Sequence, residues 1–381
     1  MSTHTDPRPA LAAGALLLAL AWPAAAVNFT PTGLVCDEPA EYPAQVTDPG
    51  LVNAWGVAYS PTSPFWVASA GTSTSPIYAV NPLTQATSKQ GLTVAIPGGE
   101  VTGLVFNPLG ANAFNGNAFL FVATDGSVAG WRPALGTTAE TLVLASPANA
   151  YTGAAFGTVG GQGYLYAANL LNGSVDVYKG NAAAPGLSGS FADPSLPSGY
   201  APFNVQTLGD SVFVTYAQQS GGDEVVGAGL GVVNRFDLQG QFVERIATNG
   251  PLNAPWGVAI APSSFGDMAG DLLVGNFGDG RINAYDPLTH AFLGQVSAAD
   301  GQPLEIEGLW ALTPGNDAQA GSSALLYYSA GPDDEEHGVF GGLQTSTLSA
   351  SAGTGGTGGT DGTGGSPPAA GSGGSGPPLG Y

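Results

Sequence analysis

Short apolar runs separated by turn residues recur along most of the chain. Examples are PFWVAS at 64–69, AFLFVAT at 118–124 and DLLVGN at 271–276, with Gly, Pro, Asn or Asp close to their ends. Runs of this length and with such boundaries are typical of β-strands. The pattern therefore predicts an all-β fold built from many short strands.

One phrase repeats six times. WGVA at 55–58 returns at 256–259, and related phrases complete the series of starts at Trp55, Thr102, Thr152, Phe203, Trp256 and Glu307. In the fourth phrase Asn204 replaces the glycine. The starts lie 47 to 53 residues apart, and further strand-like runs follow each of them. About four strands in some fifty residues, repeated six times, predict a six-bladed β-propeller with four strands per blade.

The two ends of the repeat region indicate how the ring closes. The last unit shows three strand-like runs, of which the third lies at 339–343, and Asn28 to Val35 is a strand-like segment ahead of the first unit. An unpaired edge strand invites aggregation. We therefore expect Asn28–Val35 to be the outer strand of the sixth blade, in a propeller that covers residues 27–345.

The first 26 residues have the features of a secretory signal peptide. A polar start is followed by an apolar run from Ala10 to Trp22 and by small residues up to Ala26, where we place the cleavage. The alternative is an uncleaved anchor, but the run is short compared with the ~20 residues that span a bilayer. We expect an extracellular or periplasmic protein without a membrane span after cleavage.

The composition excludes several classes of protein. Only 9% of the residues are charged, the net charge is −21, and the chain holds 60 Gly and 30 Pro. The seven basic residues are scattered, and a nucleic-acid site needs a basic surface. Cys36 is the only cysteine, so no internal disulfide can form. We expect Cys36 to be a strand residue, with a lipid anchor or a reactive thiol as alternatives.

The segments quoted above also carry a family resemblance. The stretch from Leu34 to Ala70 resembles the opening of an uncharacterised family of exported bacterial proteins, which are interpreted as propellers of the NHL kind, and NAPWGVAIAPSSFG at 253–266 and AGPDDEEHGVFGGL at 330–343 resemble later phrases of that family. Cys36 and Ala54 depart from the family pattern, and the C-terminal sorting signal of some members is missing. The resemblance implies this fold and export, and it implies no activity.

The six repeat starts should meet at one mouth of the central channel. The residues there are Trp55, Thr102, Thr152, Phe203, Asn204, Trp256 and Glu307. Aromatic walls with a few polar groups suit a small molecule, a glycan or a protein side chain. The alternative is that these side chains only pack the channel.

Two places could hold Ca²⁺, which prefers several oxygen ligands. Glu307 followed by Gly resembles the metal-binding Glu of calcium-dependent lactonases, and Asn204 could add an oxygen. Asp333 and Asp334 belong to the acidic run 333–336, which could instead be a solvated loop. No Ser-His-Asp elbow motif, zinc cluster or phosphate loop accompanies these residues. The sequence favours a monomeric recognition or scaffold module over an enzyme, with a Ca²⁺-dependent lactonase-like hydrolase as the alternative.

The C-terminal segment 346–381 is dominated by Gly, Ser, Thr and Pro and predicts a disordered tail. We expect removal of residues 351–381 to leave the melting temperature unchanged, because this composition cannot bury an apolar face. Thermal unfolding of the full chain and of a chain ending at Ala350 checks this. A fall of many degrees in the shorter chain would show that the tail docks on the propeller.

Overall fold

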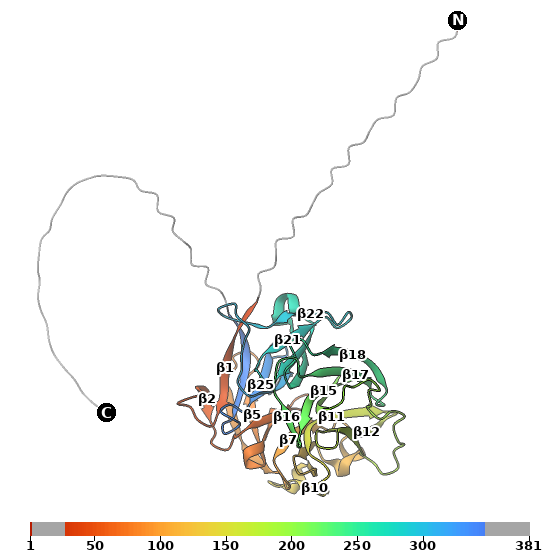
Figure 1. Ribbon diagram of the computed structural model, residues 1–381. Helices are drawn as coiled ribbons and strands as arrows, with labels where there is room; N and C mark the ends of the chain where they lie inside the picture. Colours follow the sequence, from red (N-terminus) through yellow and green to blue (C-terminus); the bar gives the residue numbers. More distant parts are fainter. Residues whose placement is uncertain (2–26, 347–381) are drawn as a thin grey trace, which may run out of the picture. The chain divides into compact units, whose positions relative to one another are not determined.

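The computed structural model describes Met1 and residues 27–346, which form six antiparallel sheets arranged as a six-bladed β-propeller (Figure 1). The predicted fold class is confirmed. The signal peptide predicted at 1–26 and the tail predicted at 346–381 lie outside the described residues, apart from Met1 and Ser346. Within the described part, no helix has the length and apolar character needed to cross a membrane.

The first three blades follow the chain in order. Their strands are β3 (Ala54–Ala58), β4 (Phe65–Ser69), β5 (Thr74–Val80) and β6 (Thr87–Ala95) in blade one; β7 (Val101–Phe106), β8 (Phe119–Ala123), β9 (Val128–Trp131) and β10 (Glu140–Val143) in blade two; and β11 (Tyr151–Val159), β12 (Gln162–Asn169) and β13 (Ser174–Lys179) in blade three.

The last three blades continue the ring. Their strands are β14 (Tyr200–Leu208), β15 (Ser211–Ser220), β17 (Val232–Asp237) and β18 (Phe242–Thr248) in blade four, with β16 (Asp223–Val225) beside β15; β19 (Pro255–Ile260), β20 (Leu272–Asn276), β21 (Ile282–Tyr285) and β22 (Phe292–Gln295) in blade five; and β24 (Leu309–Pro314), β25 (Leu326–Ala330), β26 (Val339–Ser346), β1 (Asn28–Cys36) and β2 (Ala44–Thr47) in blade six, with β23 (Ser297–Ala298) beside β1. Short 3₁₀ segments lie in the connections, namely η1 (Ala70–Thr72), η2 (Gly110–Asn112), η3 (Phe114–Gly116), η4 (Pro133–Leu135) and η5 (Ser263–Met268).

The third blade has three strands instead of the expected four. The segment 180–199 that follows β13 contains three prolines, which cannot donate to a strand ladder. It crosses to blade four, where the Phe191 N–H donates to the Gly240 carbonyl (2.8 Å). The Phe191 ring packs between Tyr166 and Phe236, with ring centroids 4.8 and 5.5 Å away. The missing strand is thus replaced by a loop that ties two blades together.

The N-terminal strand closes the ring, as predicted. β1 pairs antiparallel with β26 from Asn28–Ser346 to Cys36–Val339. Cys36 ends this strand and is fully buried, which confirms it as a strand residue, and burial raises the pKa of its thiol. The Asp37 carboxylate adds a contact to His337 Nδ1 (2.9 Å) and accepts the Gly338 N–H (3.0 Å). The two ends of the propeller are therefore joined by backbone and side chain.

Each inner strand carries a β-bulge near its start. The pairing register of the inner strands shifts within Ala54/Val57, Val101/Gly103, Tyr151/Gly153, Pro202/Asn204, Pro255/Val258 and Leu309/Leu312. A bulge turns the strand and increases its twist. Five of the six repeat phrases lie at inner-strand starts, as predicted, and the structure adds that they fall on these bulges.

The sixth phrase is shifted by three residues from its expected place. Trp310 and Ala311 lie within the bulge of β24, in the places that Trp55 and Gly56 occupy in β3. Glu307 lies in the turn ahead of the strand. It resembled a repeat start because Gly308 follows it, but Gly308 serves that turn with a φ of +63°.

Small residues at the bulges let the backbones of neighbouring inner strands come close together. A Cβ added to Gly56 would lie 2.7 Å from the Thr102 carbonyl oxygen, and one added to Gly257 would lie 2.6 Å from the Trp310 carbonyl oxygen. At Gly153 the added Cβ would lie 2.9 Å from the Cα of Asn204. In blades one, two, three and five the repeated glycine is therefore explained by the close approach of the next inner strand.

We expect Gly153→Ala to lower the free energy of unfolding by about 2 kcal/mol, because the methyl group overpacks a contact that backbone atoms form. Urea unfolding measures the change. Gly91→Ala is the matched control, because Gly91 lies in exposed β6 with no atom within 4 Å of an added Cβ. Equal stability of the two variants would contradict the proposed role of the bulge glycines.

We expect a chain that begins at Pro49 to aggregate or to lose cooperative unfolding. The truncation removes β1 and β2, exposes the edge of β26 and deletes the buried side chains of Phe29, Leu34 and Val35. Each of these contributes about 2 kcal/mol on burial, and a domain has only ~5–15 kcal/mol to lose. Calorimetry against a chain that begins at Val27 checks this, and identical melting would refute closure by β1.

Candidate functional site

Aromatic side chains fill the central channel near the starts of the inner strands. Trp310 is fully buried and stacks between Trp55 and Phe277, with ring centroids 3.6 and 4.1 Å away. Trp256 meets Trp310 edge to face at 5.8 Å. We call these four side chains the aromatic plug. The sequence predicted Trp55 and Trp256 here and missed Trp310, because the register of the sixth repeat was set at Glu307.

The hydroxyl residues predicted for the channel mouth are buried and join neighbouring blades. Thr102 Oγ1 donates to the Tyr151 carbonyl (2.7 Å), and Thr152 Oγ1 donates to the Phe203 carbonyl (2.7 Å). Each bond runs from one inner strand to the next. These contacts agree with channel packing, the alternative that the sequence left open.

The residues of the fourth repeat phrase, Phe203 and Asn204, also link neighbouring blades. Asn204 Nδ2 donates to the Trp256 carbonyl (2.9 Å), and Trp256 Nε1 donates to the Thr152 carbonyl (2.9 Å). Phe203 is fully buried and meets Trp310 edge to face at 5.8 Å. Where the other phrases have a small residue, Asn204 bridges blades four and five with its side chain.

Glu307 is not placed with these residues. It is exposed, its Oε1 accepts the Asp333 N–H (3.2 Å), and it borders a cavity of about 410 Å³ with Phe277, Asp279 and Glu305. Asn204 is 1% exposed and lines none of the cavities that Glu307 borders. The two residues proposed for one Ca²⁺ ion thus line no common cavity, and Ca²⁺ binding at Glu307 stays a prediction.

The acidic run 333–336 splits between two places. The ligand atoms of Asp333 and His337 come together with those of Glu41 within 4.8 Å, the one such group of three or more within residues 27–346. The Asp37 carboxylate raises the pKa of His337, chiefly through their hydrogen bond. Asp334 is exposed and lies outside this group. Of the two predicted metal ligands in this loop, the structure brings only Asp333 to other ligands.

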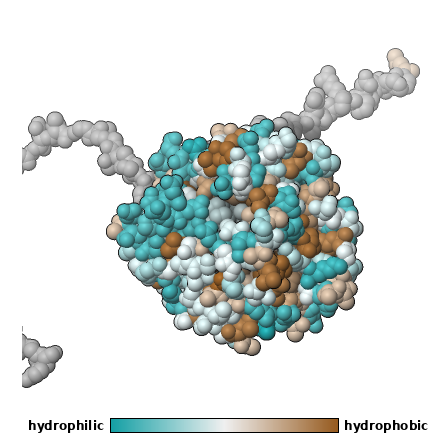
Figure 2. All heavy atoms as spheres, turned by 60° about the horizontal axis from the view of Figure 1, so that its bottom comes forward, coloured by the Kyte–Doolittle hydropathy of each residue, from teal (hydrophilic) through white to brown (hydrophobic). Residues whose placement is uncertain are grey.

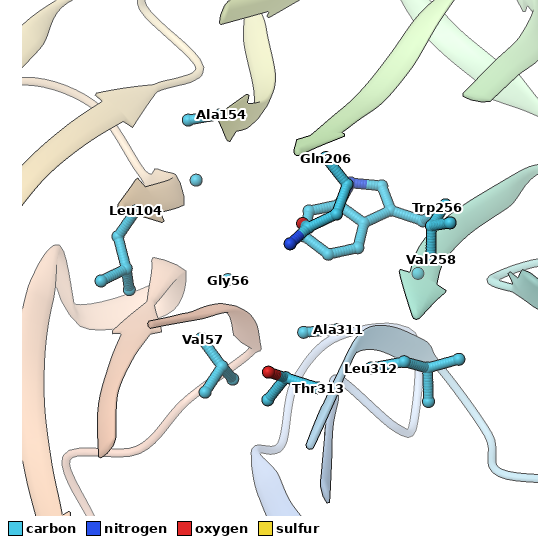
Figure 3. A pocket seen from close by; sticks show the side chains of 12 residues that line it. Gly56, Val57, Leu104, Ala154, Gln206, Trp256, Val258, Ala311, Leu312 and Thr313 are labelled. Atoms are coloured by element: carbon cyan, nitrogen blue, oxygen red, sulfur yellow. The ribbon is translucent and has the colours of Figure 1, made fainter. Parts of the chain in front are cut away.

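The opposite end of the channel opens into a funnel of about 310 Å³. Its wall is formed by the ends of inner strands, with the lining residues Val57, Ala58, Tyr59, Leu104, Val105, Phe106, Pro108, Ala154, Ala155, Phe156, Gln206, Thr207 and Thr313. Beside Trp256, where the plug begins, the funnel continues into a small cavity of about 20 Å³. Figure 3 shows Leu104, Val57, Thr313 and Gln206 around this opening.

Polar groups form part of the funnel wall beside the apolar side chains. Thr207 Oγ1 is buried without a hydrogen-bond partner among the described residues. Gln206 makes no side-chain hydrogen bond within the same part of the chain, and its neighbour across the opening is Thr313. The Tyr59 hydroxyl donates to the Pro314 carbonyl (2.6 Å), and burial raises the pKa of Tyr59.

The sequence contained a signal for this funnel that the repeat analysis missed. The residue two places after the bulge glycine or its replacement is Ala58, Val105, Ala155 and Ala259 in blades one, two, three and five, but Gln206 and Thr313 in blades four and six. A polar residue in an otherwise apolar column of a repeat marks a place where the repeats differ. The expected site lay at the strand starts, whereas this funnel lies at the strand ends.

The face drawn in Figure 2 has no single extended apolar patch. Apolar side chains lie in small groups among polar ones, and the large exposed apolar residues include Leu83, Leu144 and Leu288. Scattered exposed apolar residues are normal for a protein surface. The channel ends are therefore the better candidates for binding.

Structures of other propellers resemble this chain in outline. Streptogramin B lyase shares 11% identity over 84% of this chain and 98% of that chain, with a TM-score of 0.45. A periplasmic gluconolactonase of Pseudomonas aeruginosa, PpgL, shares 15% over 76% and 84%, with a TM-score of 0.44. A glucose dehydrogenase shares 12% over 83% and 100%, with a TM-score of 0.49. At these values the likeness says nothing about the chemistry of this chain.

The relatives found by sequence are viral, whereas the resemblance noted from the sequence was to exported bacterial proteins. No model of a known protein family matches the chain. Uncharacterized protein L690 of Acanthamoeba polyphaga mimivirus is 27% identical over 78% of this chain and 81% of its own. Uncharacterized protein R648 of the same virus is 31% identical over 283 residues, 70% of each chain. The chain belongs to the family of this viral protein R648.

Proposed function

We propose that this propeller is a binding module that holds a small uncharged molecule in the funnel at the strand ends. The observation that supports it is the cavity of about 310 Å³, whose wall combines apolar side chains with polar groups, of which Thr207 Oγ1 has no partner within the described residues. This combination is the usual anatomy of a small-molecule site. The volume suits a compact ligand near the lower limit for such sites.

The wall supplies the affinity of the proposed site. Leu104, Val105 and Phe106 come from β7, and Ala154 to Phe156 come from β11, so two blades offer continuous apolar surface. Burial of apolar ligand surface contributes about 25 cal/mol per Å². The bulges and the aromatic plug hold these strands in place, so the site is formed before the ligand arrives.

The polar groups of the funnel would orient the proposed ligand. A buried hydroxyl without a partner costs stability, and a ligand oxygen or amide beside Thr207 Oγ1 would remove that cost. The adjacent Gln206 offers both a donor and an acceptor. A ligand with one polar end therefore suits blade four, with its apolar part directed towards β7.

The chemistry of the lining favours binding over catalysis. Tyr59 is the only ionisable residue that lines the funnel; a tyrosine is neutral near pH 7, and burial raises the pKa of Tyr59 still further from that pH. General acid–base catalysis needs a group that titrates near the working pH. We further propose, from the N-terminal sequence, that the module is exported to the periplasm or the exterior and acts there as a monomer.

We expect Thr207→Val to weaken binding of uncharged fragments about tenfold, because it removes a hydrogen bond inside a desolvated site. Ligand-observed NMR with a panel of neutral fragments and lactones provides the probe, and Gln206→Leu should act in the same direction. Thr158→Val is the matched control, because Thr158 is exposed on β11 outside the funnel.

Two results would overturn this proposal. Fragments that bind the Thr207 and Thr158 variants equally well would place binding elsewhere. Hydrolysis of the lactones by the wild type, abolished by EDTA and by Glu307→Gln, would favour the calcium-dependent hydrolase instead.

A further inference from the structure

A histidine and two carboxylates come together near the place where the ring closes. Glu41 lies between β1 and β2, and Asp333 and His337 lie in the turn between β25 and β26. These segments are far apart in the sequence, and the pairing of β1 with β26 brings them to one place in blade six. A ligand atom of each residue lies within 4.8 Å of the other two, and none of the three residues lines the funnel.

The Asp37 carboxylate determines which nitrogen of His337 is free. His337 Nδ1 lies 2.9 Å from Asp37 Oδ2, and Asp37 Oδ1 accepts the Gly338 N–H (3.0 Å). An ionised carboxylate only accepts hydrogen bonds, so Nδ1 carries the hydrogen and Nε2 is left to offer its lone pair. The Tyr42 ring, 5.6 Å away between centroids, also packs against the imidazole. A carboxylate behind the imidazole is the usual outer shell of a histidine that binds a metal ion.

The free nitrogen of His337 lies near the carboxylates at a distance that fits a shared ion. Nε2 is 4.0 Å from Asp333 Oδ2. Ligand atoms about 2.1 Å from a tetrahedral zinc ion lie about 3.3 Å from one another. Asp333 and Glu41 are exposed, so a small rotation of their side chains is enough to reach this spacing. The backbone is already held, because the Asp333 N–H donates to Glu307 Oε1 (3.2 Å).

No lysine or arginine within residues 27–346 pairs with Glu41 or Asp333. The ion pairs that these basic residues form in this part of the chain involve other acids, namely Asp48, Glu140, Asp193, Glu244 and Glu305. The alternative to a metal site is a surface ion pair between protonated His337 and Asp333. Exposed pairs of that kind contribute little to stability. Addition of a metal ion distinguishes the two.

The types of donor atom select the metal. An imidazole nitrogen suits Zn²⁺, whereas Ca²⁺ takes six to eight oxygen ligands. One nitrogen and two carboxylates give three protein ligands, and water in a fourth position completes an open zinc site. The group therefore favours Zn²⁺ over the Ca²⁺ that the sequence suggested for Asp333 and Asp334.

We propose that Glu41, Asp333 and His337 bind one Zn²⁺ ion, which links the segment after β1 to the turn before β26. The ion stabilises the closed ring, because only the folded chain brings the three ligands together. The site is separate from the funnel, and its occupation does not depend on the neutral ligand proposed there.

Titration calorimetry with Zn²⁺ alone tests the proposal. We expect one ion per chain and a loss of affinity of roughly tenfold or more in Asp333→Asn and in Glu41→Gln, because each change removes a direct ligand. Both residues are exposed, and asparagine tolerates the φ of +55° at position 333, so folding is not at risk. Ca²⁺ should bind more weakly than Zn²⁺.

Asp334→Asn is the matched control. It makes the same change of charge in the next residue of the turn, which is exposed, has a φ of +50° and lies outside the group. This variant should bind Zn²⁺ like the wild type. Zn²⁺ should also raise the melting temperature of the wild type and of the Asp334 variant, and leave that of the Asp333 variant unchanged.

Nitrogen-15 NMR of the imidazole rings gives an independent signature. Zn²⁺ should shift the Nε2 signal of His337 and leave His290 unchanged, although His290 lies 3.5 Å from the Glu244 carboxylate. Asp37→Asn should weaken binding about tenfold and alter the His337 signals, since it removes the acceptor at Nδ1. Equal affinity in the Asp333 and Asp334 variants, no measurable Zn²⁺ binding, tighter binding of Ca²⁺ or an unchanged His337 signal would overturn the proposal.

Discussion

Six inner strands must pass one another around a narrow axis, and this constraint determines the centre of the molecule. At the bulges the strands approach so closely that a Cβ on Gly103 would lie 2.6 Å from the Ala154 nitrogen. Neighbouring strands are then linked by side chains that reach a carbonyl of the next blade, as Thr102 and Thr152 do. The same positions therefore carry both the repeat signature and the contacts that hold the ring together.

The aromatic plug divides the channel into two chemically different ends. On the side of the plug where the inner strands end, the funnel is lined by apolar side chains and by polar ones, among them Gln206 and Thr207. On the other side of the plug, the Glu335 carboxylate accepts from the Asn53 side chain, whose Oδ1 accepts from Trp310 Nε1.

The β25–β26 turn of blade six takes part in closing the ring. His337 contacts Asp37 next to β1, and its carbonyl accepts the Asn53 N–H (3.1 Å), while Glu335 two residues earlier accepts from the Asn53 side chain. Asp333, Asp334 and Glu335 all have positive φ, which is unfavourable for residues with a side chain. The surrounding contacts maintain this conformation, so the β25–β26 turn of blade six, which contacts Asp37 and Asn53, also positions the Glu335 carboxylate.

The sequence by itself determined the number of blades, the strand that closes the ring and five of the six inner-strand starts. These depend on local runs, turn residues and a repeat, all of which are visible in one dimension. Only the tertiary structure decided that Trp310 and not Glu307 completes the sixth repeat, because a turn glycine at Gly308 resembles a packing glycine until its neighbours are known. Likewise, only the structure shows that Thr102 and Asn204 donate hydrogen bonds to carbonyl groups of the next blade. Glu41 is far from Asp333 and His337 in the sequence, and only the closed ring brings their ligand atoms within 4.8 Å of one another.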